Sequence, residues 1–368
     1  MTRTLPPFRA DHVGSLLRPS SLKEARARHA RGEISAVDLA AAENAAIECI
    51  VGRQAEAGLC SATDGEFRRA MWHFDFLEEL DGVESFRSDH GIAFKGGIET
   101  QAKGLRVTGK LGFSGHSMLE HFRFLRDHTR ATPKMTIPSP SVLHFRGGRR
   151  AIDPGIYPDM EEFYRDLGEA YRGAVQAFAK EGCRYLQLDE VNLAYLCDSE
   201  QRQMLRDRGD DPDRLPQVYA EMINTAISGR PTGMVITMHL CRGNFRSSWI
   251  AQGGYEPVAE LLFNQIGVDG YFMEFDTERA GGFEPLRFVP KGKTVVLGIV
   301  TSKAGTLESM DYLERRIEEA ARFLDPDQLC LSPQCGFAST EEGNLLSEDD
   351  QWGKLERIVA VAEKVWGT

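Results

Sequence analysis

The sequence predicts an α/β fold, a (β/α)8 TIM barrel in which strands and helices alternate. The chain has 368 residues, a length that suits one such barrel. Its short apolar segments are dense in β-branched and aromatic residues, which is typical of parallel strands covered on both faces. No G-x-G-x-x-G or G-x-x-x-x-G-K motif follows these segments, so the barrel is favoured over a doubly wound open sheet.

About eight strands can be placed along the chain, and we expect one domain spanning residues 1–368. A helix with a capping signal at Ser35 and Asp38 should end at Gly58, where a strand begins at once. The same order of helix, glycine and strand returns at Gly182, which indicates a repeated βα unit. The expected strands are residues 11–15, 59–63, 134–137, 184–188, 234–238, 270–275, 294–300 and 328–331.

A long insertion, residues 81–130, interrupts this alternation after the second strand. It contains the alternating Leu105 and Val107, polar turns and several histidines. Segments of this length inside a compact domain are usually functional or carry secondary structure of their own. We therefore expect a β-hairpin and a short helix beside the active-site mouth.

Charge and cysteine content exclude several classes of function. Lys and Arg total 44 against 55 Asp and Glu, a net charge of −11, so neither a nucleic acid nor an anionic membrane is an expected partner. The sequence shows no membrane-spanning apolar stretch and no signal-peptide pattern in residues 1–14, so we expect a cytoplasmic protein. The seven cysteines are expected to be reduced.

The strongest chemical signal follows the expected strand 234–238. His239 and Cys241 are two residues apart, so in an extended backbone both side chains point to one side. Glu274 ends the next expected strand, and Cys335 follows the last one. The carboxyl ends of barrel strands form one ring, so these four side chains should converge. Imidazole, two thiolates and a carboxylate suit a tetrahedral Zn²⁺ site.

Each of these residues also has an ordinary structural alternative. Cys335 could line the core, His239 could be only hydrogen-bonded, and Glu274 could form a salt bridge. The combination at spacings that fit a barrel favours the metal site. The other cysteines lack such neighbours and are expected to be structural.

Several motifs resemble the catalytic C-terminal barrel of cobalamin-independent methionine synthase. The specific match is to its zinc signature: T-x-H-x-C-x-x-N-F at residues 237–245, the strand-end Glu274, and P-x-C-G at residues 333–336. Weaker matches are H-V-G-S at residues 12–15, D-G-E at 64–66 and Q-L-D-E at 187–190. The resemblance therefore covers nearly the whole chain.

The resemblance implies a catalytic barrel that binds Zn²⁺ through His239, Cys241, Glu274 and Cys335, with the substrate thiol displacing the carboxylate. Free thiols titrate at about 8.5, and coordination to a metal removes the proton at neutral pH. The resulting thiolate would attack an electrophilic carbon of the donor in line.

Further roles follow from the same resemblance. The backbone of Val13, Gly14 and Ser15 would bind the carboxylate of homocysteine, while Glu66 and Asp189 would bind its ammonium group. The alternative for Glu66 is an ion pair with Arg68 or Arg69.

Two more candidates lie near the expected strand ends. Asp189 and Glu190 are paired acids whose pKa values can be pushed apart, leaving one able to act as a catalytic acid. Either acid could instead cap a helix. His144 is a candidate substrate-binding residue that would face the donor.

The predicted function is zinc-dependent transfer of an alkyl group, in the first place methyl, to the thiol of homocysteine or a similar small thiol. This would be an S-methyltransferase of methionine biosynthesis, with methylated folate or another compound as donor. The oligomeric state is open, with a homo-oligomer among the alternatives. The donor is also open, because the family's second barrel and its seventh-strand histidine have no counterpart, and Val191 replaces a usual proline.

Three alternative functions remain. An epoxyalkane:coenzyme M transferase would open an epoxide with a zinc-activated thiol, and it should place Arg18, Arg68 or Arg69 in the pocket to bind sulfonate. A barrel that binds zinc or a thiol without catalysis would show no turnover. A decarboxylase of the uroporphyrinogen type would need no metal.

Overall fold

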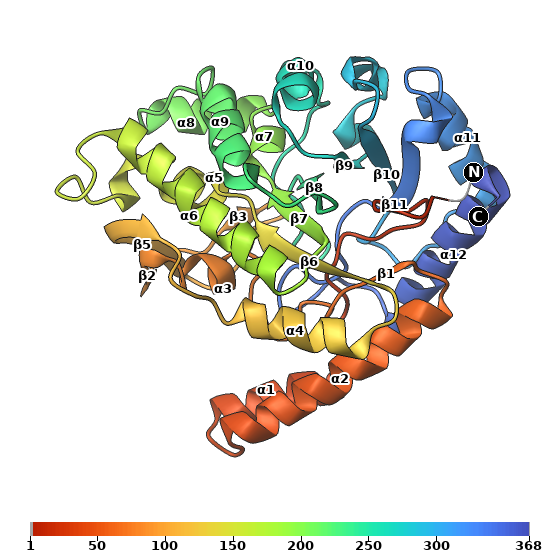
Figure 1. Ribbon diagram of the computed structural model, residues 1–368, viewed down its shortest axis with the longest axis horizontal. Coiled ribbons are helices and arrows are strands. Elements are labelled where there is room, and N and C mark those ends of the chain that lie inside the picture. The colour runs from red at the N-terminus through yellow and green to blue at the C-terminus, as the bar shows by residue number, and fades with distance from the viewer. Residues whose placement is uncertain (1–2, 368) are drawn as a thin grey trace.

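The computed structural model describes residues 3–367, in which helices surround a central parallel sheet (Figure 1). The α-helices are α1 Ser20–Ala30, α2 Ala36–Glu56, α3 Phe74–Leu77, α4 Met118–His128, α5 Ser141–Gly147, α6 Met160–Lys180, α7 Asn192–Tyr195, α8 Ser199–Asp207, α9 Leu215–Ile227, α10 Glu256–Gln265, α11 Met310–Ala320 and α12 Glu348–Trp366. The strands are β1 Ser61–Ala62, β2 Asp81–Arg87, β3 Ala93–Phe94, β4 Ile98–Glu99, β5 Lys103–Gly112, β6 Thr132–Pro138, β7 Tyr185–Glu190, β8 Val235–Leu240, β9 Gly270–Glu274, β10 Thr294–Val300 and β11 Leu329–Pro333.

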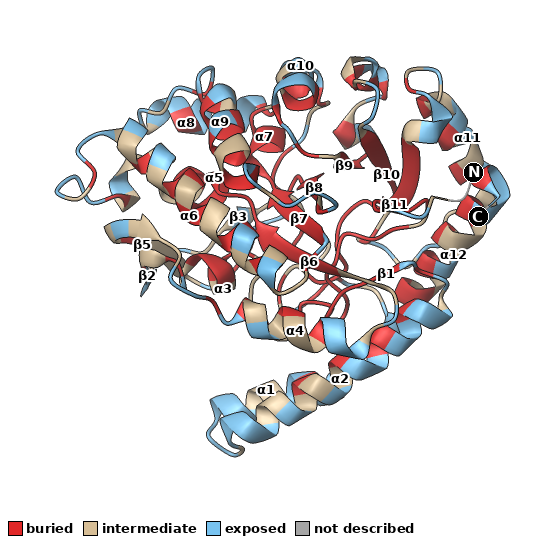
Figure 2. Ribbon diagram, viewed as in Figure 1, coloured by how far each residue is buried: buried red, intermediate tan, exposed pale blue. Residues whose placement is uncertain are grey.

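Within these residues, the central sheet has seven parallel strands in the order β1-β6-β7-β8-β9-β10-β11. Every residue of β7, β9, β10 and β11 is buried (Figure 2), as is typical of parallel strands that are covered on both faces. The predicted α/β class with a parallel barrel-type sheet is confirmed, and seven of the expected strands lie where the apolar segments placed them.

The prediction of a first strand at residues 11–15 was wrong. Only Ala10 forms a bridge, to Leu331 of β11. The segment nevertheless lies between the two ends of the sheet, because Asp11 donates to the Leu331 carbonyl and Leu16 donates to the Gly65 carbonyl. Side chains bind its carbonyl groups in place of a strand ladder; for example, Gln187 donates to the carbonyl of Val13. It therefore closes the barrel without forming a regular strand.

The insertion at residues 81–130 forms two antiparallel pairs, β2 with β5 and β3 with β4, followed by α4. The β3–β4 hairpin contacts the loop after β8: Lys95 N–H donates to the Trp249 carbonyl at 2.8 Å, and the Phe94 and Phe245 rings lie 5.4 Å apart. The insertion is thereby attached to the loop that follows Cys241.

The N-terminal helices extend from the main body of the protein (Figure 1). The predicted capping box is present at the start of α2, where Ser35 and Asp38 each bind the other's backbone N–H. The sequence analysis did not predict α1, whose buried face is limited to Leu22. No helix within residues 3–367 has the length and apolar content needed to cross a membrane.

A buried ion pair lies inside the barrel beneath the pocket. Lys134 Nζ is 3.4 Å from Asp11 Oδ1, and both side chains are fully buried. Asp11 also accepts hydrogen bonds from the hydroxyl groups of Ser61 and Tyr185. Burial lowers the pKa of Lys134, while Asp11 opposes that shift. The pair and its hydrogen bonds link residues 11–15, which close the barrel, to β6 and β7.

We predict that Lys134→Met lowers the free energy of unfolding by about 3–5 kcal/mol, because the Asp11 carboxylate would be left buried without its cation. Urea denaturation followed by circular dichroism measures this loss. The double variant Lys134→Met, Asp11→Asn should recover part of it, since the buried charge is then removed. Equal stability of the single variant and the wild type would contradict this role for the pair.

Candidate metal centre and substrate pocket

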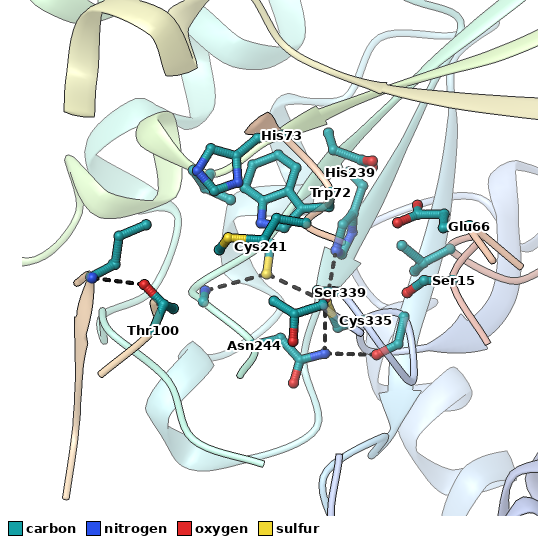
Figure 3. A pocket seen from close by; sticks show the side chains of 18 of the residues that line it. Ser15, Glu66, Trp72, His73, Thr100, His239, Cys241, Asn244, Cys335 and Ser339 are labelled. Carbon is teal, nitrogen blue, oxygen red and sulfur yellow. Dashed lines mark hydrogen bonds between the residues drawn. The ribbon is translucent and has the colours of Figure 1, made fainter. Parts of the chain in front are cut away.

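Four side chains meet at the carboxyl ends of the central strands. The ligand atoms of His239, Cys241, Glu274 and Cys335 all lie within 4.8 Å of one another, and all four residues are buried. His239 Nε2 is 3.4 Å from Cys335 Sγ, and the two sulfur atoms are 3.5 Å apart (Figure 3). The cluster brings together the four residues that the sequence analysis predicted as metal ligands.

The strands position these ligands through side-chain alternation. His239 lies next to the end of β8, and Cys241 directly follows the strand, so both point into the barrel. Glu274 is the last residue of the adjacent β9. Cys335 comes two residues after β11, the terminal strand of the sheet, which is separated from β9 by β10.

The donor set and its spacing fit a tetrahedral metal ion. With metal–ligand bonds of about 2.0–2.3 Å, neighbouring ligand atoms should be about 3.3–3.8 Å apart. The distances from Cys335 Sγ to His239 Nε2 and to Cys241 Sγ fall within this range. The two sulfurs are much farther apart than the roughly 2.05 Å of a disulfide, and both cysteines are free thiols.

The cluster favours a thiolate at Cys335. The hydrogen bond from the Cys241 thiol holds the pKa of Cys335 well below its ordinary value, and His239 adds to this effect against the cost of burial. Burial would lower the pKa of His239, but the neighbouring Cys335 raises it overall. The imidazole and the two sulfurs are thus electrostatically coupled.

Two basic residues hold the Glu274 carboxylate. Oε1 accepts the Arg242 backbone N–H at 3.1 Å, and Oε2 lies 3.2 Å from Arg279 Nη2. Burial would raise the pKa of Glu274, but Arg279 and then Lys303 lower it overall. The carboxylate is therefore ionised and has binding partners besides a metal.

Three of the four candidate ligands, His239, Cys241 and Cys335, line a pocket with about 580 Å³ of atom-free space, including its open mouth. Figure 3 shows Glu66 and Ser15 on one side of the cysteines and Thr100 on the other. The pocket thus has a polar half and a predominantly apolar half. Polar-half residues include Val13, Ser15, Glu66 and Asp189; the other half includes Met71, Trp72, His73, Ile92, Phe94, Thr100, Arg146, Val191 and Tyr195.

The backbone at Val13, Gly14 and Ser15 offers hydrogen-bond donors in the polar half. All three residues are buried, and no acceptor within residues 3–367 receives a hydrogen bond from their backbone N–H groups. Val13 and Ser15 line the pocket, while Gly14 lies between them against Thr136 and Glu66. Successive free N–H groups of this kind suit a carboxylate.

Glu66 and Asp189 supply two carboxylates to the same half. Glu66 Oε1 accepts from the Thr136 hydroxyl at 2.9 Å and is 3.5 Å from Arg69 Nη1, whereas the buried Oε2 has no hydrogen-bond partner. Glu66 thus forms the ion pair considered from the sequence and also lines the pocket. Burial, reinforced by Glu66, raises the pKa of Asp189 to about 7. A cationic ligand would offset the cost of this paired negative charge.

Two sequence-derived candidates, Glu190 and His144, point away from the pocket. Glu190 follows Asp189 in β7, so its side chain points to the opposite face, where it accepts the backbone N–H groups of Asn192 and Leu193 and a hydrogen bond from Ser141. It caps α7, the alternative that the sequence analysis left open for the paired acids.

His144 packs between helices instead of facing the pocket. Its Nδ1 is 2.9 Å from the Tyr219 hydroxyl, and its Nε2 is 3.1 Å from the Tyr164 hydroxyl. Burial lowers the pKa of His144 to about 4, so the ring is neutral at physiological pH. Both ring nitrogens are engaged away from the candidate site.

The apolar half contains residues that the sequence analysis missed. Trp72 and His73 lie in the loop after β1, Phe94 lies in the insertion, and Arg146 lies on α5. The sequence gives one indication of their role, which is their place in loops that follow barrel strands. Loops at the carboxyl ends of barrel strands line the active face. Asn244, part of the quoted motif, donates to the Gly336 carbonyl and joins the β8 loop to the β11 loop.

The arginines expected for sulfonate binding are engaged elsewhere. Arg18 donates to the carbonyls of Glu66 and Arg69 among others, and Arg68 pairs with Glu43. Arg69 donates to the Thr136 carbonyl. None of these three arginines lines the pocket.

Fold and site together define a parallel α/β barrel with a four-residue candidate metal centre at the carboxyl ends of its strands. Residues 131–363 match the family described as "Cobalamin-independent synthase, Catalytic domain". The chain belongs to this family.

Individual relatives agree with this assignment. The uncharacterized protein YxjH of Bacillus subtilis is 52% identical over 98% of this chain and 95% of its own length. The methionine synthase of Pyrococcus abyssi is 24% identical over 90% of this chain and 87% of its own. A Listeria monocytogenes crystal structure, described as that of the "Putative Vitamin-B12 Independent Methionine Synthase", has a TM-score of 0.79 and 42% identity over 99% of both chains.

We predict that Gly14→Ala destabilises the protein by about 1–3 kcal/mol. Gly14 has φ of +143°, and an added Cβ would lie 2.7 Å from Thr136 Cγ2. Calorimetry measures the change in unfolding. The matched control is Gly353→Ala on α12, where the added Cβ has nothing within 4 Å and should be neutral or stabilising. Equal effects of the two substitutions would contradict a specific backbone requirement at Gly14.

Proposed function

We propose that this protein transfers a methyl group to the thiol of homocysteine, or a similar small amino-acid thiol, in a zinc-dependent reaction. The convergence of His239, Cys241, Glu274 and Cys335 carries this proposal. Family membership supports methyl transfer as the type of reaction. A zinc ion held by these residues would supply the acidity that turns a thiol into a thiolate at neutral pH.

The polar half of the pocket suits the amino-acid end of homocysteine. The backbone N–H groups at Val13, Gly14 and Ser15 would bind its carboxylate, and Glu66 Oε2 and Asp189 would bind its ammonium group. These contacts would hold the sulfur beside Cys241 and Cys335. The donor would then enter from the apolar half, on the other side of the reacting sulfur.

Glu274 is the ligand best suited to yield its place to the substrate sulfur. When it leaves the cluster, its carboxylate keeps the Arg242 N–H and the Arg279 guanidinium as partners. Within residues 3–367, neither cysteine sulfur accepts a hydrogen bond from an arginine or lysine side chain, and Lys303 acts on both only at longer range. Exchange at Glu274 therefore costs less electrostatic energy than exchange at a thiolate.

The same geometry favours an amino-acid thiol over coenzyme M. A sulfonate would meet Glu66 and Asp189 in the polar half, while Arg18, Arg68 and Arg69 bind protein groups instead. Repulsion between these carboxylates and an anionic sulfonate disfavours the epoxide-opening alternative.

We predict that Cys335→Ala and His239→Ala eliminate stoichiometric zinc while retaining the far-ultraviolet circular dichroism of the wild type, because the ligands sit at strand ends. Glu274→Ala should retain more zinc than either. Elemental analysis of the purified proteins gives the metal content.

Cys49→Ala, at an exposed cysteine outside the cluster, is the control and should bind zinc like the wild type. Wild-type protein without zinc-binding capacity would favour the metal-free decarboxylase instead. If Glu274→Ala lost zinc as completely as Cys335→Ala, the exchangeable-ligand role would be refuted.

We predict that Glu66→Gln weakens homocysteine binding to the zinc-loaded protein about tenfold or more, because a charge-assisted hydrogen bond to the ammonium group is lost. The matched ligand is 4-mercaptobutanoate, which lacks the amino group and should bind wild type and variant alike. Isothermal titration measures both, with coenzyme M as a third ligand. Tighter binding of coenzyme M than of homocysteine would reject the proposed acceptor.

A further inference from the structure

Gln187 lies one layer beneath the polar half of the pocket. It is on β7 two residues before Asp189, so the two side chains point to the same face of the strand. Gln187 is fully buried and is not among the residues that line the pocket. It can therefore hold the groups that line the polar half without touching a ligand bound there.

The side-chain amide of Gln187 binds two of these groups at once. Its Nε2 donates to the Val13 carbonyl at 2.7 Å and to Asp189 Oδ1 at 2.7 Å. A carbonyl group has no proton to donate, so the atom that faces Val13 must be the amide nitrogen. Both protons of this NH2 group are thereby used. Because the amide is planar, the directions of the two hydrogen bonds are fixed relative to each other.

The bond to Val13 also orients a backbone donor. In a trans peptide the C=O of one residue and the N–H of the next point in opposite directions, so the Gly14 N–H points away from Gln187. The next peptide repeats the arrangement, because the Thr63 hydroxyl donates to the Gly14 carbonyl at 2.6 Å and the Ser15 N–H points the other way. Neither N–H group has an acceptor within residues 3–367.

The oxygen of the same amide indicates that Gln187 does more than fill the interior. Gln187 Oε1 is buried and has no hydrogen-bond partner in the described part of the chain. An unpaired buried acceptor costs stability, and a residue kept only for packing would avoid that cost. The neighbouring strand offers a parallel: Thr136 of β6 pairs in register with Gln187 and donates to Glu66 Oε1 at 2.9 Å.

We propose that Gln187 is a positioning residue that makes the pocket selective for a thiol carrying an ammonium and a carboxylate group on one carbon. Its amide nitrogen holds Asp189, which would bind the ammonium group, and aims the Gly14 N–H, which would bind the carboxylate. The spacing between these two recognition elements is thereby set for an α-amino acid. The inference rests on the proposed function for the roles of Asp189 and of the backbone at residues 13–15.

The test compares four thiols that share a three-carbon chain and differ in its end groups. Homocysteine carries both charged groups, 4-mercaptobutanoate only the carboxylate, 3-mercaptopropylamine only the ammonium group, and propanethiol neither. Isothermal titration into the zinc-loaded protein measures the affinity for each thiol. No methyl donor is present, so no turnover occurs.

The variant is Gln187→Met, which keeps the length of the side chain and removes the amide. A second variant, Gln187→Glu, keeps its shape, but a carboxyl group cannot donate to both acceptors. The matched control is Gln328→Met. Gln328 Nε2 also donates to two backbone carbonyls, those of Pro290 and Lys293, but Gln328 directly precedes β11, at the end of the barrel opposite the pocket.

The wild type and Gln328→Met should bind homocysteine more tightly than any of the other three thiols. Gln187→Met should bind homocysteine about tenfold more weakly or worse, and each singly charged thiol about threefold more weakly or worse, because both recognition elements lose their support. Its affinity for propanethiol and its zinc content should match those of the wild type. Gln187→Glu should give the same order of losses.

An unchanged ratio of homocysteine to propanethiol affinity in the Gln187 variants would overturn the inference and leave the proposed function intact. Equal losses for all four thiols, or failure of both variants to fold, would also overturn it, because a purely structural role gives those results. A zinc-loaded wild type that binds homocysteine no more tightly than propanethiol would contradict the proposed function itself.

Discussion

The parallel register of β7, β8 and β9 is the constraint on which the site depends. Asp189 of β7 pairs in register with His239 of β8, and Glu274 ends the neighbouring β9. Backbone hydrogen bonds set these positions, so the acid proposed to bind substrate and the proposed metal ligands are held on rigid elements before either ligand would arrive. Preorganisation of this kind keeps reacting groups within the narrow geometry that catalysis requires.

In the proposed reaction, the two halves of the pocket would recognise the two substrates by different chemistry. Glu66 and Asp189 concentrate negative charge and free backbone donors in one half, which suits a zwitterionic amino acid. Trp72 and Tyr195 provide flat apolar surfaces in the other half, with Arg146 at its border. Because His239, Cys241 and Cys335 lie between the halves, the proposed acceptor and donor would approach the reacting sulfur from different directions.

Sequence periodicity predicted seven of the eight expected strands and the four-residue cluster, because strand order alone brings His239 and Glu274 together. It did not settle which of Asp189 and Glu190 enters the pocket, a choice that depends on which face of β7 points inward. The packing of His144 between Tyr164 and Tyr219 depends on tertiary contacts, which the sequence around His144 does not indicate. The position of Arg146 depends on how α5 and the insertion meet, and the path of such connections does not follow from residue spacing.

The N-terminal segment around residues 11–15, which closes the barrel, affects the order in which parts of the protein can fold. Arg9 donates to the Leu329 carbonyl, and Ser15 accepts a hydrogen bond from the Ala338 backbone N–H. Contacts between positions so distant in sequence form late, because a large loop must first be closed. During translation, the part of the pocket that is made first therefore cannot reach its final position until the last βα units have left the ribosome. A nascent chain that stops before Cys335 lacks both a closed barrel and a complete ligand set.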